Sequence, residues 1–281
     1  MVFHSILYEN TQTGSAVEAA QEPASFADLN LDQVINAITA GRQEYNLKPF
    51  FYAPLHDAGT IGYRQQVMQD LEDESLLDHI KSFAQRMSAT RRCLALAEKL
   101  DFRYHREGWF LEAADAFCDA VTSLARDLRL ADLESRGLVA FRDYLAAYVQ
   151  ADAFVQLRAE TQKLKADLSG IRYCVLIKGN LVRVRRYEDE IDYSADVEAT
   201  FEKFKQSAVK DYRVKLPDRS GMSHVEAQIL ALVAKLYPDT FASLDAFCAR
   251  HASFVDQTIG VFDREIQFYV AYLDHIAKIK R

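Results

Sequence analysis

Apolar side chains recur at alternating steps of four and three residues through much of this chain. The clearest example starts at Phe110 and ends at Leu128. The same spacing covers residues 76–97 and 255–276. Such spacing places apolar side chains on one face of an α-helix, so each segment predicts a long helix packed against a neighbour. The regular spacing of the last segment is typical of an antiparallel helix pair or a coiled-coil arm.

Two places interrupt this helical pattern. A long segment over residues 138–168 shifts its phase near Asp152, which predicts a kink or a change of packing partner. Between residues 171 and 187, apolar residues instead alternate with others on both sides of Gly179-Asn180, a pair that suits a tight turn. The chain is therefore predicted to contain one β-hairpin among long helices.

Capping signals indicate where several helices begin and end. Asn30 fits the start of a helix that Gly41 can end, and Ser223 with Glu226 forms a capping-box pattern. Residues 10–24 are rich in small and polar side chains and indicate a loop. We therefore expect the folded body to begin near Asn30.

Composition narrows the classes of protein to consider. The 281 residues carry a formal net charge of −7, so a contact with nucleic acid would have to be local. Ten glycines and five prolines are too few for the turns of a β-sandwich or barrel. Four cysteines without a C-x-x-C pair predict reduced thiols. Without a signal-like or membrane-spanning segment, we expect a cytoplasmic protein with no membrane partner.

Motifs for nucleotide hydrolysis and for metal catalysis are missing from the sequence. No glycine is followed by lysine, so the phosphate-binding G-x-x-x-x-G-K-[ST] loop is absent. No glutamate has a histidine three residues later, and no two histidines have the H-x-x-x-H spacing of a helical metal site. We therefore predict no catalytic residue, no metal site and no cofactor in this chain, which is not an enzyme by itself.

The predicted hairpin carries a local basic cluster. Its five cations could contact DNA phosphates, because arginine and lysine neutralise the backbone charge and release counterions. Carboxylates follow immediately from residue 188 to residue 192, so intramolecular salt bridges on a solvated face are the alternative. Both interpretations stay open for the candidate DNA-binding residues, which are Arg172, Lys178, Arg183, Arg185 and Arg186.

Residues 50–80 contain a family signature. An aromatic run leads into Pro54-Leu55, followed by Asp57, Ile61 and Arg64 at fixed spacing. This stretch resembles the start of the helical core of the MutS family of DNA repair ATPases, in which the pattern is P-L-x-D-x-x-x-I-x-x-R. From the residues themselves we predict capping and packing roles for these positions, with Asp57 or a nearby hydroxyl capping a helix.

The resemblance implies an architecture as well. It covers the body from about residue 26 onward and implies a helical core with lever arms, which are long helices running outward and back. The predicted class is all-α, an elongated bundle of long antiparallel helices with one small β-hairpin insertion. The expected parts are an N-terminal extension, a core with an outgoing lever, an insertion of a hairpin and a short helix, and returning helices, over residues 1–26, 27–169, 170–220 and 221–281.

The resemblance also implies a function. The chain would be the non-catalytic core and lever module of a divergent MutS-like ATPase, and we expect the ATPase domain, with its ATP and Mg²⁺, beyond Arg281. The implied partners are branched or duplex DNA and a second copy of the full-length protein. The alternative, from another class, is a free-standing helical scaffold that binds a protein partner through its arms and does not bind DNA.

Overall fold

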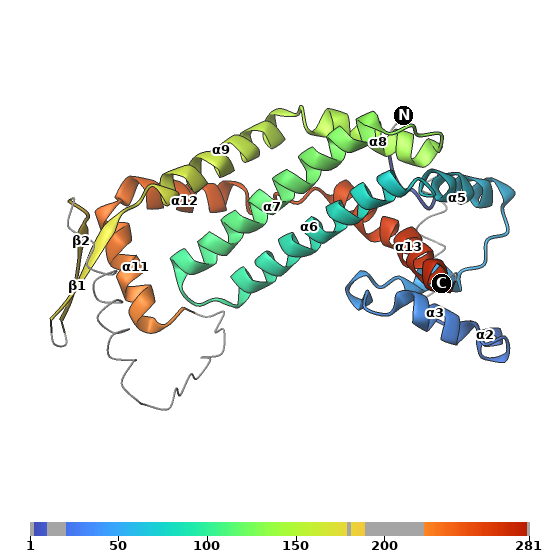
Figure 1. Ribbon diagram of the computed structural model, residues 1–281, viewed down its shortest axis with the longest axis horizontal. Helices are drawn as coiled ribbons and strands as arrows, with labels where there is room; N and C mark the ends of the chain where they lie inside the picture. The colour runs from blue at the N-terminus through green and yellow to red at the C-terminus, as the bar shows by residue number, and fades with distance from the viewer. Residues whose placement is uncertain (1–2, 10–20, 179–180, 189–221, 280–281) are drawn as a thin grey trace, which may run out of the picture.

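A computed structural model describes the fold over residues 3–9, 21–178, 181–188 and 222–279. Within these residues the chain forms α-helices, one 3₁₀ turn and one two-stranded antiparallel sheet. Figure 1 shows an elongated body with the hairpin at one end and both chain termini toward the other. We call that opposite end the base. The predicted class, an elongated all-α bundle with one small hairpin, is confirmed.

Two amphipathic segments of the sequence form the central antiparallel pair. α6 (Glu74–Lys99) follows Asp73, whose carboxylate accepts a hydrogen bond from the Leu76 amide at 2.8 Å and so caps the helix. α7 (Arg103–Leu130) returns beside α6 (Figure 1). The predicted apolar faces of both helices are buried against each other and against the neighbouring helices.

The predicted phase shift near Asp152 is a break between two helices. α8 (Arg136–Tyr148) ends before it and α9 (Asp152–Ser169) begins at it. α9 packs along α7 and leads to the hairpin, formed by β1 (Tyr173–Lys178) and β2 (Leu181–Arg186). The packing partner changes at this break, as the pattern predicted, because α8 packs on α7 and α5 (Ala58–Asp70), whereas α9 packs on α7 and α12 (Pro238–Arg250).

The chain returns from the hairpin end through three helices, which are α11 (His224–Leu236), α12 (Pro238–Arg250) and α13 (Gln257–Ile279). The predicted capping box precedes α11, and Pro238 stands at the first position of α12. α12 packs on α7 and α9. α13 buries charged and apolar side chains on several faces, so it lies inside the base and is more enclosed than the arm of a helix pair.

Short helices complete the base. The predicted helix after Asn30 is present, but Asn30 adopts a left-handed backbone with φ of 54° and its side chain makes no cap. Gly41 follows the helix with φ of +76°, a conformation that favours glycine. The elements are α2 (Ser25–Asp28), α3 (Leu31–Thr39), η1 (Gln43–Tyr45), α4 (Lys48–Tyr52) and α5 (Ala58–Asp70).

Residues 3–8, here called the N-terminal segment, belong to the core, which corrects the prediction that the folded body begins near Asn30. Phe3, Ile6, Leu7 and Tyr8 are each no more than 4% exposed. The segment forms neither helix nor strand, and six residues are too few to show a period. Periodicity therefore cannot reveal that this segment is buried.

Side chains of α5 and α13 hold the backbone of the N-terminal segment. The carbonyls of residues 5, 6 and 7 accept hydrogen bonds from Tyr63, Tyr269 and Arg64 at 2.7, 2.9 and 3.1 Å. The Glu265 carboxylate accepts from the residue 6 amide and the residue 5 hydroxyl at 2.8 and 2.7 Å. These bonds satisfy backbone groups that would otherwise be buried without partners.

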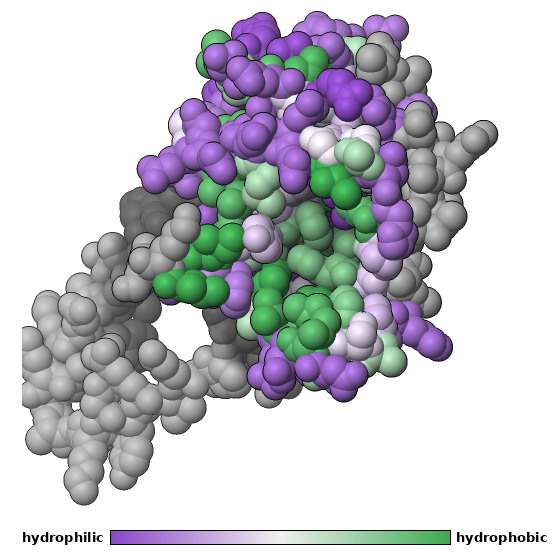
Figure 2. Space-filling model, turned by 90° about the vertical axis from the view of Figure 1, so that its right-hand side faces the viewer, coloured by the Kyte–Doolittle hydropathy of each residue, from purple (hydrophilic) through white to green (hydrophobic). Residues whose placement is uncertain are grey.

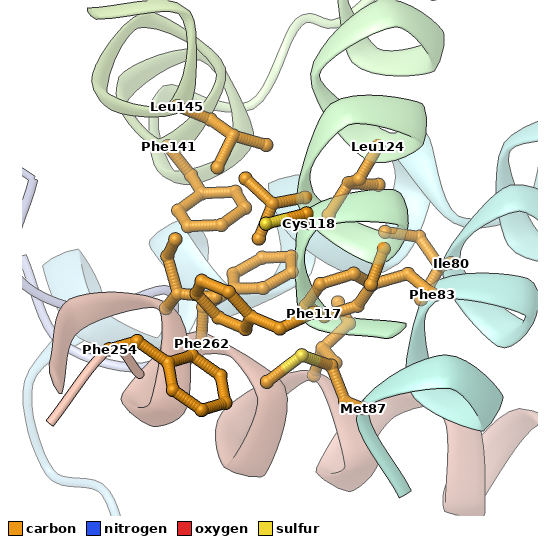
Figure 3. Packing of buried hydrophobic residues seen from close by; sticks show 14 of the residues in the cluster. Ile80, Phe83, Met87, Phe117, Cys118, Leu124, Phe141, Leu145, Phe254 and Phe262 are labelled. Atoms are coloured by element: carbon orange, nitrogen blue, oxygen red, sulfur yellow. The ribbon is translucent and has the colours of Figure 1, made fainter. Parts of the chain in front are cut away.

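Aromatic side chains fill the core where the central pair meets the base. The Phe141 and Phe262 rings are stacked with their centroids 3.5 Å apart, and the Phe117 and Phe254 rings meet edge to face at 5.4 Å. Figure 3 shows these rings converging from α7, α8 and the α13 region onto α6. The core therefore joins the base and the long helices continuously.

Candidate nucleic-acid interface

The hairpin confirms the predicted strands and fixes which side chains share a face. β1 and β2 are antiparallel, with Tyr173 opposite Arg186 and Lys178 opposite Leu181. Directly opposed residues lie on the same face of a sheet, and successive residues alternate between faces. The predicted turn, Gly179-Asn180, lies outside the described residues.

One face of the hairpin is turned toward α11. Val184 is partly buried against the core, and α11 packs on β2. On the same face Arg186 donates two hydrogen bonds to the Leu236 carbonyl, at 2.6 and 3.2 Å, and its guanidinium lies 5.0 Å from the centre of the Tyr237 ring. Arg186 therefore attaches the hairpin to the C-terminal end of α11, where a cation is favoured.

The opposite face, here called the outer face, gathers three of the predicted cations. Lys178 and Arg183 are exposed, and Arg185 is half-buried. Arg185 approaches Glu188 at 3.4 Å, which is the kind of intramolecular contact that the alternative interpretation predicted. The remaining carboxylates of that alternative, from Asp189 to Asp192, lie outside the described residues.

Arg172 stands just before β1 and is exposed. Its carbonyl accepts a hydrogen bond from the Tyr237 hydroxyl at 2.5 Å, which ties the foot of the hairpin to the α11–α12 junction. The five predicted cations therefore lie at three different places on the hairpin. Arg186 attaches the hairpin to the helices, Arg172 lies at its foot, and Lys178, Arg183 and Arg185 share the outer face.

The family signature lies at the base, away from the hairpin (Figure 1). Asp57 caps α5 by accepting hydrogen bonds from the Thr60 amide and hydroxyl at 2.7 and 2.9 Å, and these bonds lower its pKa. Arg64 is buried and donates a hydrogen bond to the Leu7 carbonyl at 3.1 Å. Pro54 and Ile61 are exposed and Leu55 is half-buried, so the predicted packing is strongest at Arg64.

In the part of the chain that the structure describes, no three histidine, cysteine, aspartate or glutamate side chains are grouped so that they could hold a metal ion. None of the helices described is both long and apolar enough to cross a membrane. Desolvation raises the pKa of the buried Cys118 thiol and of the half-buried Cys248 thiol to about 12, which disfavours a reactive thiolate at either position.

Sequence reasoning missed two features of these regions. No sequence motif marks Glu265. Its burial nevertheless raises its pKa to about 7, although the hydrogen bonds from the N-terminal segment lower it. On the hairpin, the exposed side chains of Leu176 and Leu181 share the outer face with the cations. Strand parity could have placed the leucines, whereas only the tertiary contacts reveal the carboxylate.

Comparison of the chain with family models, with curated proteins and with solved structures gives no match.

Proposed function

We propose that the chain is the non-catalytic core and lever module of a MutS-like DNA repair ATPase. In this proposal the outer face of the hairpin contacts branched or duplex DNA, and the long helices connect that contact to the base. ATP and Mg²⁺ would be bound by an ATPase domain outside these 281 residues, and the full-length protein would act as a homodimer.

The placement of cations on the hairpin carries this proposal. Lys178, Arg183 and Arg185 lie on one side of a strand pair at the end of the elongated body, while the base holds the signature. Residues two apart on a strand are separated by about 6.8 Å, so the cations can meet successive backbone phosphates. A local cluster of this kind can bind phosphates even on an acidic protein.

A paired substitution tests the DNA contact. Arg183→Ala with Arg185→Ala removes two cations from the outer face without touching the attachment through Arg186. We expect weaker binding to duplex and branched DNA, and a plot of log affinity against log salt concentration whose slope falls in magnitude by about 2. Fluorescence anisotropy with a labelled DNA across a salt series measures both quantities.

A matched control separates the hairpin from the overall charge. Arg126→Ala with Arg129→Ala removes the same charge from exposed positions on α7 near the base. This control is expected to bind DNA as the unaltered chain does. Equal binding by all three proteins, or equal losses in both double variants, would contradict a DNA contact through the hairpin.

A second candidate function is a scaffold for a protein partner. Figure 2 shows apolar side chains gathered around a hollow on the base end of the molecule. The large apolar side chains exposed at this end include Leu29, directly after α2, Val34 on α3 and Ile61 on α5. Exposed apolar surface of this kind is typical of protein-binding sites.

Sedimentation velocity can test whether the partner of this scaffold is a second copy of the chain. Val34→Asp should abolish any concentration-dependent association, because it places a charge on the apolar end face. Val155→Asp is the matched control, because Val155 has a similar exposure on α9, away from the base. A chain that stays monomeric at all concentrations would leave self-association without support.

A further inference from the structure

A polar cavity of about 430 Å³ lies at the base, between three parts of the chain. The turn after α3 forms one wall, the middle of α6 forms the second, and residues 267–274 of α13 form the third (Figure 1). Pockets that hold small molecules have volumes of roughly 300–1,000 Å³ and place a few polar groups to orient the ligand. The size and the polar lining of this cavity therefore suit a small molecule.

Two cations on different walls of the cavity share one carboxylate. Asp274 Oδ2 accepts a hydrogen bond from Arg42 Nη2 at 2.5 Å, and Asp274 Oδ1 lies 2.8 Å from Lys81 Nζ. An arginine and a lysine each carry more N–H donors than these contacts use. The carboxylate therefore holds both cations beside the cavity, and the lining keeps a surplus of positive charge and of donors.

Gln267 supplies a further donor on the third wall. Its side chain lines the cavity, and the residue is only 4% exposed. Gln267 Oε1 accepts a hydrogen bond from Arg42 Nε at 3.4 Å, whereas Gln267 Nε2 has no hydrogen-bond partner among the residues that the structure describes. A buried donor without an acceptor lowers the stability of the folded state, so an acceptor supplied by a ligand would stabilise it.

We propose that this cavity binds a small molecule through a phosphate group, which Arg42, Lys81 and Gln267 contact from three walls. A phosphate monoester presents several terminal oxygens that accept hydrogen bonds from different directions, whereas a planar carboxylate is matched by the fork of a single arginine. The phosphate group fills only part of the cavity, and the remaining volume can hold the organic part of the ligand. The site lies at the end opposite the hairpin and does not depend on the proposed DNA contact.

Isothermal titration calorimetry with glycerol phosphate, a small phosphate monoester, tests the site at fixed ionic strength. The unaltered chain should show one saturable site. Lys81→Gln should weaken the binding about ten-fold, because it removes a charge-assisted hydrogen bond. Lys99→Gln is the matched control, since Lys99 is exposed near the end of the same helix, and it should keep the affinity.

Gln267→Met separates a role in binding from a role in the fold. Methionine is unbranched like glutamine and leaves no unpaired donor, so this variant should bind glycerol phosphate about ten-fold more weakly. Without ligand it should be at least as stable as the unaltered chain in urea unfolding, whereas a structural role of the amide would make it less stable. Circular dichroism checks its fold. If Gln267→Met does not fold, Lys81→Gln decides the test, because it alters a half-buried side chain.

The remaining outcomes distinguish the cavity from other anion-binding surfaces. Arg183→Ala with Arg185→Ala should bind glycerol phosphate as the unaltered chain does, because the hairpin is remote from the cavity. Absence of saturable binding, or full affinity in Lys81→Gln or in Gln267→Met, would overturn the inference. Tighter binding of acetate would assign the site to a carboxylate and overturn the assignment to phosphate. Displacement of glycerol phosphate by duplex DNA, if it persisted in the hairpin variant, would assign these cations to the DNA backbone and overturn the assignment to a small molecule.

Discussion

The base and the hairpin use the same residue types in opposite ways. At the base, Leu7 is 0% exposed, and the Arg64 guanidinium bonds a backbone carbonyl inside the protein. On the hairpin, Leu181 is 67% exposed, and Arg183 lies on the outer face. A leucine and an arginine therefore stabilise the fold at one end and are available to a partner at the other. Burial, which depends on the surrounding helices, decides between the two roles.

The largest expected difference between the two ends is in stability. Leu7→Ala should lower the free energy of unfolding by about 2–5 kcal/mol, because it leaves a cavity in the core beside α5 and α13. Leu181→Ala should change it by less than about 0.5 kcal/mol, because that side chain is exposed. Urea unfolding followed by circular dichroism measures both. Similar losses in the two variants would contradict the contrast in burial.

The next effect concerns the charge inside the base. Desolvation is the main cause that raises the pKa of Glu265 from 4.5 to about 7, while hydrogen bonds from the N-terminal segment and the charge of Arg64 oppose it. Between pH 4.5 and about 7, the folded state therefore keeps a proton on Glu265 that the unfolded state has released. The contribution of this proton to the stability of the folded state is complete below pH 4.5 and is lost as the pH rises through about 7.

The unaltered chain should accordingly lose about 1.4 kcal/mol of stability from this group between pH 6 and pH 8. Glu265→Gln should remove that loss, since its amide can bond the segment and does not titrate. The pKa of Asp263 is raised to about 6, so this group changes the stability mostly below pH 6, and it does so in both proteins. Urea unfolding at several pH values measures the slope, and parallel slopes in the two proteins would contradict the prediction.

A smaller effect should separate two of the arginines of β2, Arg186 and Arg183. Arg186→Ala removes the bonds to the Leu236 carbonyl and should weaken the attachment of the hairpin by about 1 kcal/mol. Hydrogen exchange of the hairpin amides should then become faster, while the midpoint of global unfolding changes little. Arg183→Ala should leave that exchange unaltered. Faster exchange in both variants would show that the two arginines do not differ in this way.

Much of the fold can be predicted from patterns formed by residues that are close in the sequence. The steps of four and three predicted α6 and α7, alternation predicted the hairpin, and Ser223 with Glu226 and Asp57 marked helix starts that the structure confirms. These signals are readable because capping and amphipathicity depend on residues within one or two turns.

The basic cluster was predicted only as a group of residues. Its separation into an attachment residue, Arg186, and an outer face depends on where α11 packs, and no local pattern contains that information. The N-terminal segment was missed for a related reason. Its bonds to Tyr269 and Glu265 join positions more than 250 residues apart, as the separations of 263 and 259 residues show.

The sequence by itself determined the helical class, the apolar faces of α6 and α7, the hairpin and its basic composition, because each arises from interactions between near neighbours. Only the tertiary structure decided which chemically similar side chains are buried and which are exposed. It placed the N-terminal segment in the core, raised the pKa of Glu265 by burial, and left Leu176 and Leu181 beside the cations of the outer face. Desolvation by distant parts of the chain is the physical reason for these differences.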